Sequence, residues 1–461
     1  MKSGSVILRF LQMALILAIL YPLLGCALSP GARRPTVVNV AAVIFPGGAP
    51  PAVLSLYKAA LEISKANSGD FELKITTLSP TMEPGAGPTN GSPIITALEQ
   101  ALAQDPPPDV VLFSSSYEFA EALSKELLQP LDPYLRSERA LKTEDYFPGA
   151  LEAVIAEGQI CGLPLSVGVT LLQYDKRLFD AAGLEPPGGN WTWSTLLEAS
   201  RVLTKVTGDS QSDQYALNLL GPLVLPSLIW QNGGDIISKD GKRSLLAEPP
   251  AVEAIKFYYD LLHTYKVSPP PPSPQGGPTP GKPVVIAREI RPGEVPPLFV
   301  PGGRVAMQFL NGYGMYIGAS PWMMGQGGER PIRVSELPRG KMQATQLEVG
   351  NVIALTNRAA NGRQAYRAMV ALVNEMQKEL TVPAQRAAAK NLRRMSPNLA
   401  EEDVQVILNS LEYARALPLA HQDKIIRVLY EKLVQPIQQG TKPPAEIARE
   451  AAEAMDEVLN Q

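Results

Sequence analysis

The chain has 461 residues with 42 basic and 45 acidic side chains, so its formal net charge is −3. A near-neutral chain has no basic patch for nucleic acid, and we expect no nucleic-acid partner. With two histidines and two cysteines the chain lacks ligands for a His/Cys metal site, so we expect neither a metal nor a cofactor. The length exceeds what one hydrophobic core supports and predicts two lobes.

The N-terminus has the parts of a secretory signal peptide, with a short basic start and an apolar stretch at 10–20. That stretch is shorter than the roughly 20 apolar residues of a transmembrane helix. Residues 23–26 (LLGC) resemble the bacterial lipobox, which implies cleavage before Cys26 and acylation of its thiol. We therefore expect a signal peptide at 1–25 and a lipid-anchored tether at 26–35. An uncleaved signal anchor is the alternative.

The second cysteine, Cys161, lies in the apolar flank 159–163. If Cys26 is acylated, Cys161 is a single thiol and no disulfide forms. A disulfide between the two cysteines is the alternative, but it would tie a flexible leader to the folded part of the chain. We expect Cys161 to be buried and unreactive.

The first part of the mature chain alternates between strand and helix patterns. β-Branched and alternating runs predict strands at 36–44, 71–78 and 109–113. Helical periodicity predicts helices at 52–67 and 94–104 between them. A strand–helix–strand–helix–strand order predicts a parallel sheet with crossover helices, and therefore an α/β fold.

The remainder of the chain is more helical. The proline-rich run at 268–283 can form neither a helix nor a central strand, and predicts an extended loop or a linker between lobes. The predicted helices are 117–128, 145–157, 193–206, 249–265, 360–377, 383–391, 400–416, 421–437 and 443–459.

Six short blocks follow one another in a fixed order over about 200 residues. They are PPDVVL at 107–112, LQPLDPYL at 128–135, GLPLS at 162–166 with LQYDKRLF at 172–179, AGLEPP at 182–187 with WTW at 191–193, IWQNGGD at 229–235, and GRVAM at 303–307. Together they resemble the extracellular solute-binding proteins of ATP-binding-cassette importers. The match is best to the large family that takes up sugars and oligosaccharides.

This resemblance implies a two-lobe periplasmic-binding-protein-like fold of type II, in which interleaved lobes are joined by hinge strands and close on a solute in a central cleft. It implies a first lobe at 36–145 plus 285–345 and a second lobe at 146–284 plus 346–461. The implied partners are a small-molecule solute, a membrane permease and, through the lipid, the cell membrane. We expect a monomer outside the cytoplasm.

A sugar site needs aromatic faces for the apolar side of a pyranose and planar polar side chains for its hydroxyls. Trp230 and Tyr313 are the expected stacking platforms, and Tyr313 stands where relatives often carry tryptophan. Local roles are the alternatives: a helix cap for Ser116, hinge packing for Tyr174 and core packing for Trp230. The expected contacts are Phe45, Ser114, Ser115, Ser116, Tyr174, Trp230, Asn232, Gly233, Asp235, Asn311, Tyr313, Gly350 and Asn351.

The carboxylates of Asp132, Asp235 and Glu348 are isolated in the sequence, so no glycosidase pair can be argued from them. The sequence also has no nucleophile elbow, phosphate-binding loop or dinucleotide fingerprint. We expect no catalytic residues and predict a carbohydrate-binding lipoprotein of an importer. A carbohydrate-active enzyme or a ligand sensor on a related scaffold remains the alternative.

Overall fold

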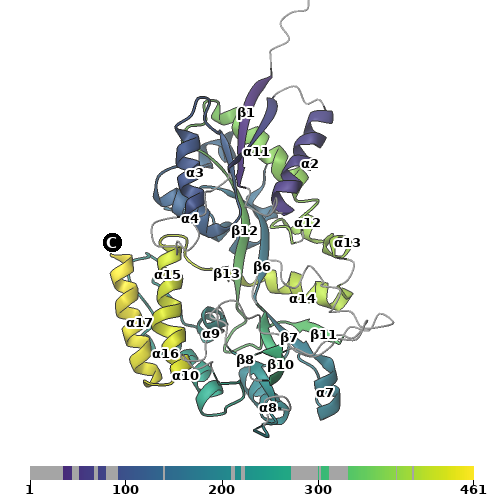
Figure 1. Cartoon of the computed structure of the whole chain (residues 1–461), viewed down its shortest axis with the longest axis vertical. Helices are drawn as coiled ribbons and strands as arrows, with labels where there is room; N and C mark the ends of the chain where they lie inside the picture. Colours follow the sequence, from purple (N-terminus) through teal and green to yellow (C-terminus); the bar gives the residue numbers. More distant parts are fainter. Residues whose placement is uncertain are drawn as a thin grey trace, which may run out of the picture.

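The computed structural model (Figure 1) shows two α/β lobes, one above the other, with long strands between them. Among the described helices, none is both long and apolar enough to cross a membrane. The structure describes residues 35–43, 51–66, 71–78, 92–138, 141–208, 213–219, 224–270, 299–300, 303–310, 331–380, 382–396 and 399–460.

The first lobe is built on a six-stranded sheet in the order β13-β12-β3-β1-β2, with β6 also paired to β12. Strand β1 is parallel to both β2 and β3, which confirms the predicted parallel arrangement. Its strands are β1 (Thr36–Val43), β2 (Phe71–Leu78), β3 (Val110–Phe113), β6 (Leu163–Val169), β12 (Thr345–Leu355) and β13 (Ala414–Ala416).

Most of the helices that cover this sheet bury an apolar face. In α2, for example, Ala52, Val53, Leu56 and Ala59 are buried at helical spacing. The helices of the lobe are α2 (Pro51–Lys65), α3 (Pro93–Leu102), α4 (Ser116–Ser124), α5 (Asp132–Ser137), α6 (Pro148–Glu152), α11 (Gly362–Met376), α12 (Arg386–Ala389), α13 (Leu392–Met395) and α14 (Glu401–Glu412).

The second lobe contains a five-stranded sheet in the order β11-β7-β10-β8, with β9 paired to β10. Its strands are β7 (Leu171–Asp175), β8 (Gln214–Asn218), β9 (Phe299–Val300), β10 (Gly303–Leu310) and β11 (Ile332–Ser335). Its helices are α7 (Lys176–Ala182), α8 (Trp193–Leu203), α9 (Leu225–Gln231), α10 (Pro249–His263), α15 (Gln422–Val428), α16 (Gln435–Gln439) and α17 (Pro444–Leu459).

Two separate apolar cores accompany the two sheets. One contains Val40, Leu112 and Ile353, and the other contains Leu217 and Ile255. The two-lobe α/β prediction is thereby confirmed. Cys161 lies buried in the first core, as expected.

The sheets divide the chain differently from the lobe boundaries that the resemblance implied. Strand β10, expected in the first lobe, is antiparallel to β7 through Met307 and Tyr174 and parallel to β8 through Met307 and Leu217. Conversely, β12 was expected in the second lobe but pairs with β3 and β6 in the first sheet. The physical reason is burial: Met307 belongs to the second core and Ile353 to the first.

Two predicted helices end early for local reasons. Residues 145–157 form only the short α6, because a β-hairpin follows it: β4 (Ile155–Ala156) pairs with β5 (Gln159–Ile160). Gly158, with φ of 75°, makes the hairpin turn. Residues 400–416 form α14 and then β13, because Ala414 and Ala416 pair with β12.

Candidate functional site

The three serines after β3 lie where the sequence placed them, at the carboxyl end of that strand. Ser115 caps α4 by accepting a hydrogen bond from the backbone N–H of Glu118. The Glu118 carboxylate in turn accepts hydrogen bonds from the Ser114 backbone and hydroxyl at 2.8–2.9 Å. Ser116 is buried. The hydroxyls of Ser114 and Ser115 therefore stabilise the first turn of α4.

The residue that this turn presents is Tyr117, which the sequence analysis did not single out. Its side chain is 40% exposed. Burial of part of the ring, and then repulsion by Glu348 on β12, raise the pKa of Tyr117 to about 12. Helix α4, which carries Tyr117, packs against β12, which carries Glu348. The sequence signal that could have identified Tyr117 is an aromatic residue directly after the serines that end a strand.

Two buried glutamines lie on elements near this pair. Gln346 precedes Glu348 by two residues and therefore points to the same face of β12. Its backbone N–H donates to the Ser227 hydroxyl on α9 at 2.9 Å. Gln422 opens α15, which packs against α4. Within the described part of the chain, the Oε1 atoms of Gln346 and Gln422 are buried and accept no hydrogen bond.

Burial removes Trp230 from the role of stacking platform in this conformation. Its side chain is 1% exposed and belongs to the second core. The indole Nε1 donates to Asp235 at 2.9 Å, and the Arg415 guanidinium lies 4.8 Å from the ring centroid. Arg415 also forms an ion pair with Asp235 at 2.8 Å. The core alternative for Trp230 is the one that the geometry supports.

The Asn-Gly pair after Trp230 forms the end of α9. Asn232 donates from Nδ2 to the Pro250 carbonyl at 2.7 Å and to Glu253 at 2.9 Å. Gly233 has φ of 80°, a conformation that favours glycine. These contacts lie within the second lobe, so both residues stabilise a turn.

Asn351 connects the strands that run between the lobes. It accepts from the Ser166 hydroxyl at 2.9 Å and donates to the Phe113 carbonyl at 3.3 Å. Gly350 and Asn351 lie at an irregularity in the pairing of β12 with β6. A bulge bends a strand, so these residues shape the crossing between the lobes.

Tyr174 lies in β7 and packs edge-on against Phe179, with ring centroids 5.6 Å apart. Burial raises the pKa of its phenol. It is a core residue of the second lobe, so its role is packing, as in the alternative, but within the lobe rather than at the hinge. Phe45, Asn311, Tyr313 and the lipidation residue Cys26 lie outside the described residues.

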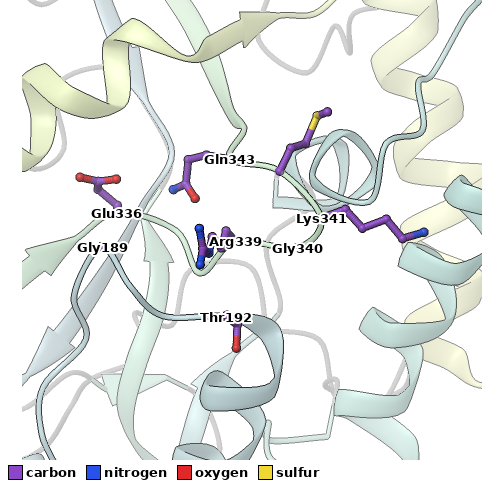
Figure 2. Close-up of a pocket in the computed structure, with 8 residues that line it drawn as sticks. Gly189, Thr192, Glu336, Arg339, Gly340, Lys341 and Gln343 are labelled. Atoms are coloured by element: carbon purple, nitrogen blue, oxygen red, sulfur yellow. The ribbon is translucent and has the colours of Figure 1, made fainter.

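A cavity of about 530 Å³ lies elsewhere, on the loop between β11 and β12 (Figure 2). The eight described residues that line it include no aromatic ring, so it offers no flat apolar surface to a sugar. Two of its polar side chains already have partners: Glu336 accepts from Tyr413, and Gln343 donates to the Leu337 carbonyl. The lining residues are Gly189, Thr192, Glu336, Arg339, Gly340, Lys341, Met342 and Gln343.

Within the described ranges, no group of three or more His, Cys, Asp and Glu side chains is placed to hold a metal ion. The polar groups on the elements around Tyr117 are hydroxyls, amides and carboxylates, including those of Ser114, Gln346 and Glu348. These groups bind polar, uncharged solutes through hydrogen bonds.

The chain is similar to known proteins in sequence over part of its length and in fold over most of it. A putative binding protein of Brucella abortus is 29% identical over 141 residues, which cover 30% of this chain and 32% of that protein. An arabinooligosaccharide-binding protein of Halalkalibacterium halodurans is 25% identical over 116 residues, or 24% of each. The aligned regions thus span a third or less of these curated relatives.

The fold itself is shared over nearly the whole chain. The crystal structure of a cyclic alpha-maltosyl-1,6-maltose binding protein from Arthrobacter globiformis has a TM-score of 0.67 and 17% identity, covering 92% of this chain and 99% of that one. The family model described as bacterial extracellular solute-binding protein matches residues 88–323, just over half of the chain. The chain belongs to the family of bacterial extracellular solute-binding proteins.

Proposed function

We propose that this protein captures a carbohydrate between its two lobes and delivers it to the membrane permease of an ATP-binding-cassette importer. The observation that carries the proposal is the half-exposed ring of Tyr117 on α4, a first-lobe helix that packs against β12, the strand of Glu348, and against α15 of the second lobe. An exposed aromatic ring on α4 and a carboxylate on the neighbouring strand β12 offer both kinds of contact that a sugar ring needs.

The relatives support the same ligand class. One curated relative is described as an arabinooligosaccharide-binding protein, and a protein of the same fold as a cyclic maltosyl-maltose binding protein. The relatives are binding proteins, which supports solute capture without catalysis. Among the expected contacts, Phe45, Asn311 and Tyr313 are proposed to complete the site.

The proposal includes the anchor. Acylation of Cys26 would hold the lobes next to the permease and raise their effective concentration there. The location outside the cytoplasm follows from the same leader sequence.

Isothermal titration of the purified protein with a panel of arabino-, malto- and manno-oligosaccharides tests the ligand class. We expect at least one sugar to bind with micromolar or tighter affinity. Binding of amino acids or polyamines, with no response to any sugar, would overturn the carbohydrate assignment.

A further inference from the structure

Helix α14 belongs to the first lobe but is bonded to the second. Its Val404, Ile407 and Leu411 side chains are buried in the first core. Its polar face, however, meets β11, a strand of the second sheet. The helix therefore spans the boundary between the lobes.

An ion pair makes the first contact across this boundary. Arg333 on β11 donates from Nε to both carboxylate oxygens of Asp403 on α14, at 3.0 and 3.2 Å. The two side chains are 22% and 7% exposed. The backbone N–H of Val334 also donates to Asp403 at 3.5 Å, and the Val334 side chain packs into the first core.

Glu336, in the loop after β11, makes the second contact. Its carboxylate accepts from the Tyr413 hydroxyl at 2.9 Å and from Asn409 Nδ2 at 3.3 Å. Tyr413 follows α14 directly, and its hydroxyl also accepts from Gln343 Nε2 at 3.1 Å. We name the contacts of Arg333 and Glu336 with Asp403, Asn409 and Tyr413 the interlobe clasp.

The interlobe clasp and the candidate sugar site lie on opposite sides of the strands that cross between the lobes. Figure 1 shows α14 and β11 on one side of β6 and β12, and α4, α9 and α15 on the other. Helix α14 contacts β6, whereas α4 and α9 contact β12. A rotation about these strands that brings α15 closer to α4 must draw β11 away from α14.

We propose that the interlobe clasp opposes closure of the lobes and so sets the ligand affinity from outside the binding site. Its members are positioning residues: they weaken binding by stabilising the more open arrangement. The predicted effect on ligand affinity rests on the proposed function. The predicted effect on the angle between the lobes does not, because the protein samples a range of such angles with or without a sugar.

The test uses the double variant R333Q/D403N, which removes both charges of the buried pair. Glu402, which also pairs with Arg333 at 3.3 Å, is 78% exposed and stays solvated in the variant. The matched control is Glu412→Gln, because Glu412 lies on the same helix but pairs with Arg386 inside the first lobe at 2.9 Å. A second, milder variant, Tyr413→Phe, removes one hydrogen bond of the clasp if the double variant folds poorly. The full-length protein is purified in detergent.

The separation of the lobes is measured by double electron–electron resonance between two spin labels. The labels are attached at Leu54→Cys on α2 and Val202→Cys on α8, two exposed positions in different lobes. Without ligand, R333Q/D403N and Tyr413→Phe should shift the distance distribution away from that of the parent protein, and Glu412→Gln should not. With any sugar that binds, the clasp variants should lower Kd about five- to tenfold, within the usual range of coupling between sites.

Unchanged distance distributions in both clasp variants would overturn the proposal. So would a Kd that rises equally in the clasp variants and the control. If no sugar binds at all, the proposed function fails, while the distances still decide whether the clasp sets the lobe angle.

Discussion

The indole Nε1 of Trp230 donates a hydrogen bond to Asp235 at 2.9 Å. The guanidinium of Arg415 lies over the indole ring and forms an ion pair with the same carboxylate. Arg415 lies on β13 of the first sheet, whereas Trp230 and Asp235 belong to the second lobe. The aromatic residue that looked most like a sugar platform thus holds the lobes together.

Substitution of Trp230 by alanine should therefore act mainly on stability. Loss of a fully buried aromatic side chain typically costs about 3–5 kcal/mol in the free energy of unfolding. Trp230→Phe keeps most of the ring volume and should lose only about 0.5–1.5 kcal/mol, for the hydrogen bond. Urea denaturation followed by circular dichroism measures both. A Trp230→Ala protein as stable as the parent would contradict the core placement.

Tyr117 should behave in the opposite way. Its ring is half-exposed, so Tyr117→Ala should change stability little but weaken sugar binding by about 1–3 kcal/mol, as loss of a stacked aromatic does. Tyr117→Phe retains the ring and serves as the control, with a smaller loss. Calorimetric titration gives the affinities. Equal affinity in the parent protein and in Tyr117→Ala would place the site elsewhere.

Tyr313 is expected to contribute a second stacking surface, on the basis of its family position. Tyr313→Ala should also weaken binding by about 1–3 kcal/mol. If both rings stack on the same sugar, the double variant with Tyr117→Ala should lose an amount that differs from the sum of the single losses. Full affinity in Tyr313→Ala would remove this residue from the site.

Glu118 should make stability depend on pH. Burial raises the pKa of its carboxyl above the ordinary value of 4.5, against the opposing effect of the hydrogen bonds from Ser114 and Ser115. The folded state then binds more protons than the unfolded state in the window between the two pKa values. Stability contributed by Glu118 is thus present at low pH and lost as pH rises through the folded pKa.

The measurement compares the free energy of unfolding of the parent protein with that of Glu118→Gln between pH 4 and pH 7. The parent should lose stability relative to the variant as pH rises. A difference that stays constant over this range, or that changes in the opposite direction, would show that burial does not dominate the environment of Glu118.

Acylation of Cys26 can be read directly from the mass of the mature N-terminus. Intact-mass spectrometry of protein isolated from membranes should show cleavage before Cys26 and the added lipid. Cys26→Ser should release the protein from the membrane fraction while leaving sugar affinity unchanged. An unmodified Cys26, or a retained leader, would favour the signal-anchor alternative.

The sequence by itself determined the class of fold and the family, because both depend on local patterns. Strand and helix periodicity predicted β1, α2, β2, α3 and β3, and six ordered blocks carried the family resemblance. The caps of α4 and the turn after α9 also follow from short-range chemistry, since Ser115 and Gly233 act within a few residues of their own positions.

Only the tertiary structure decided which lobe each later strand joins and which aromatic side chains stay exposed. Met307 pairs with residues about 90 and 130 positions away, and nothing in its own strand identifies those partners. Tyr117 follows a polar run in the sequence and Trp230 precedes one. Arg415, which is distant in the sequence, covers Trp230, whereas Tyr117 remains half-exposed on α4. Burial depends on residues far away in the chain, and that is why local patterns did not distinguish the two.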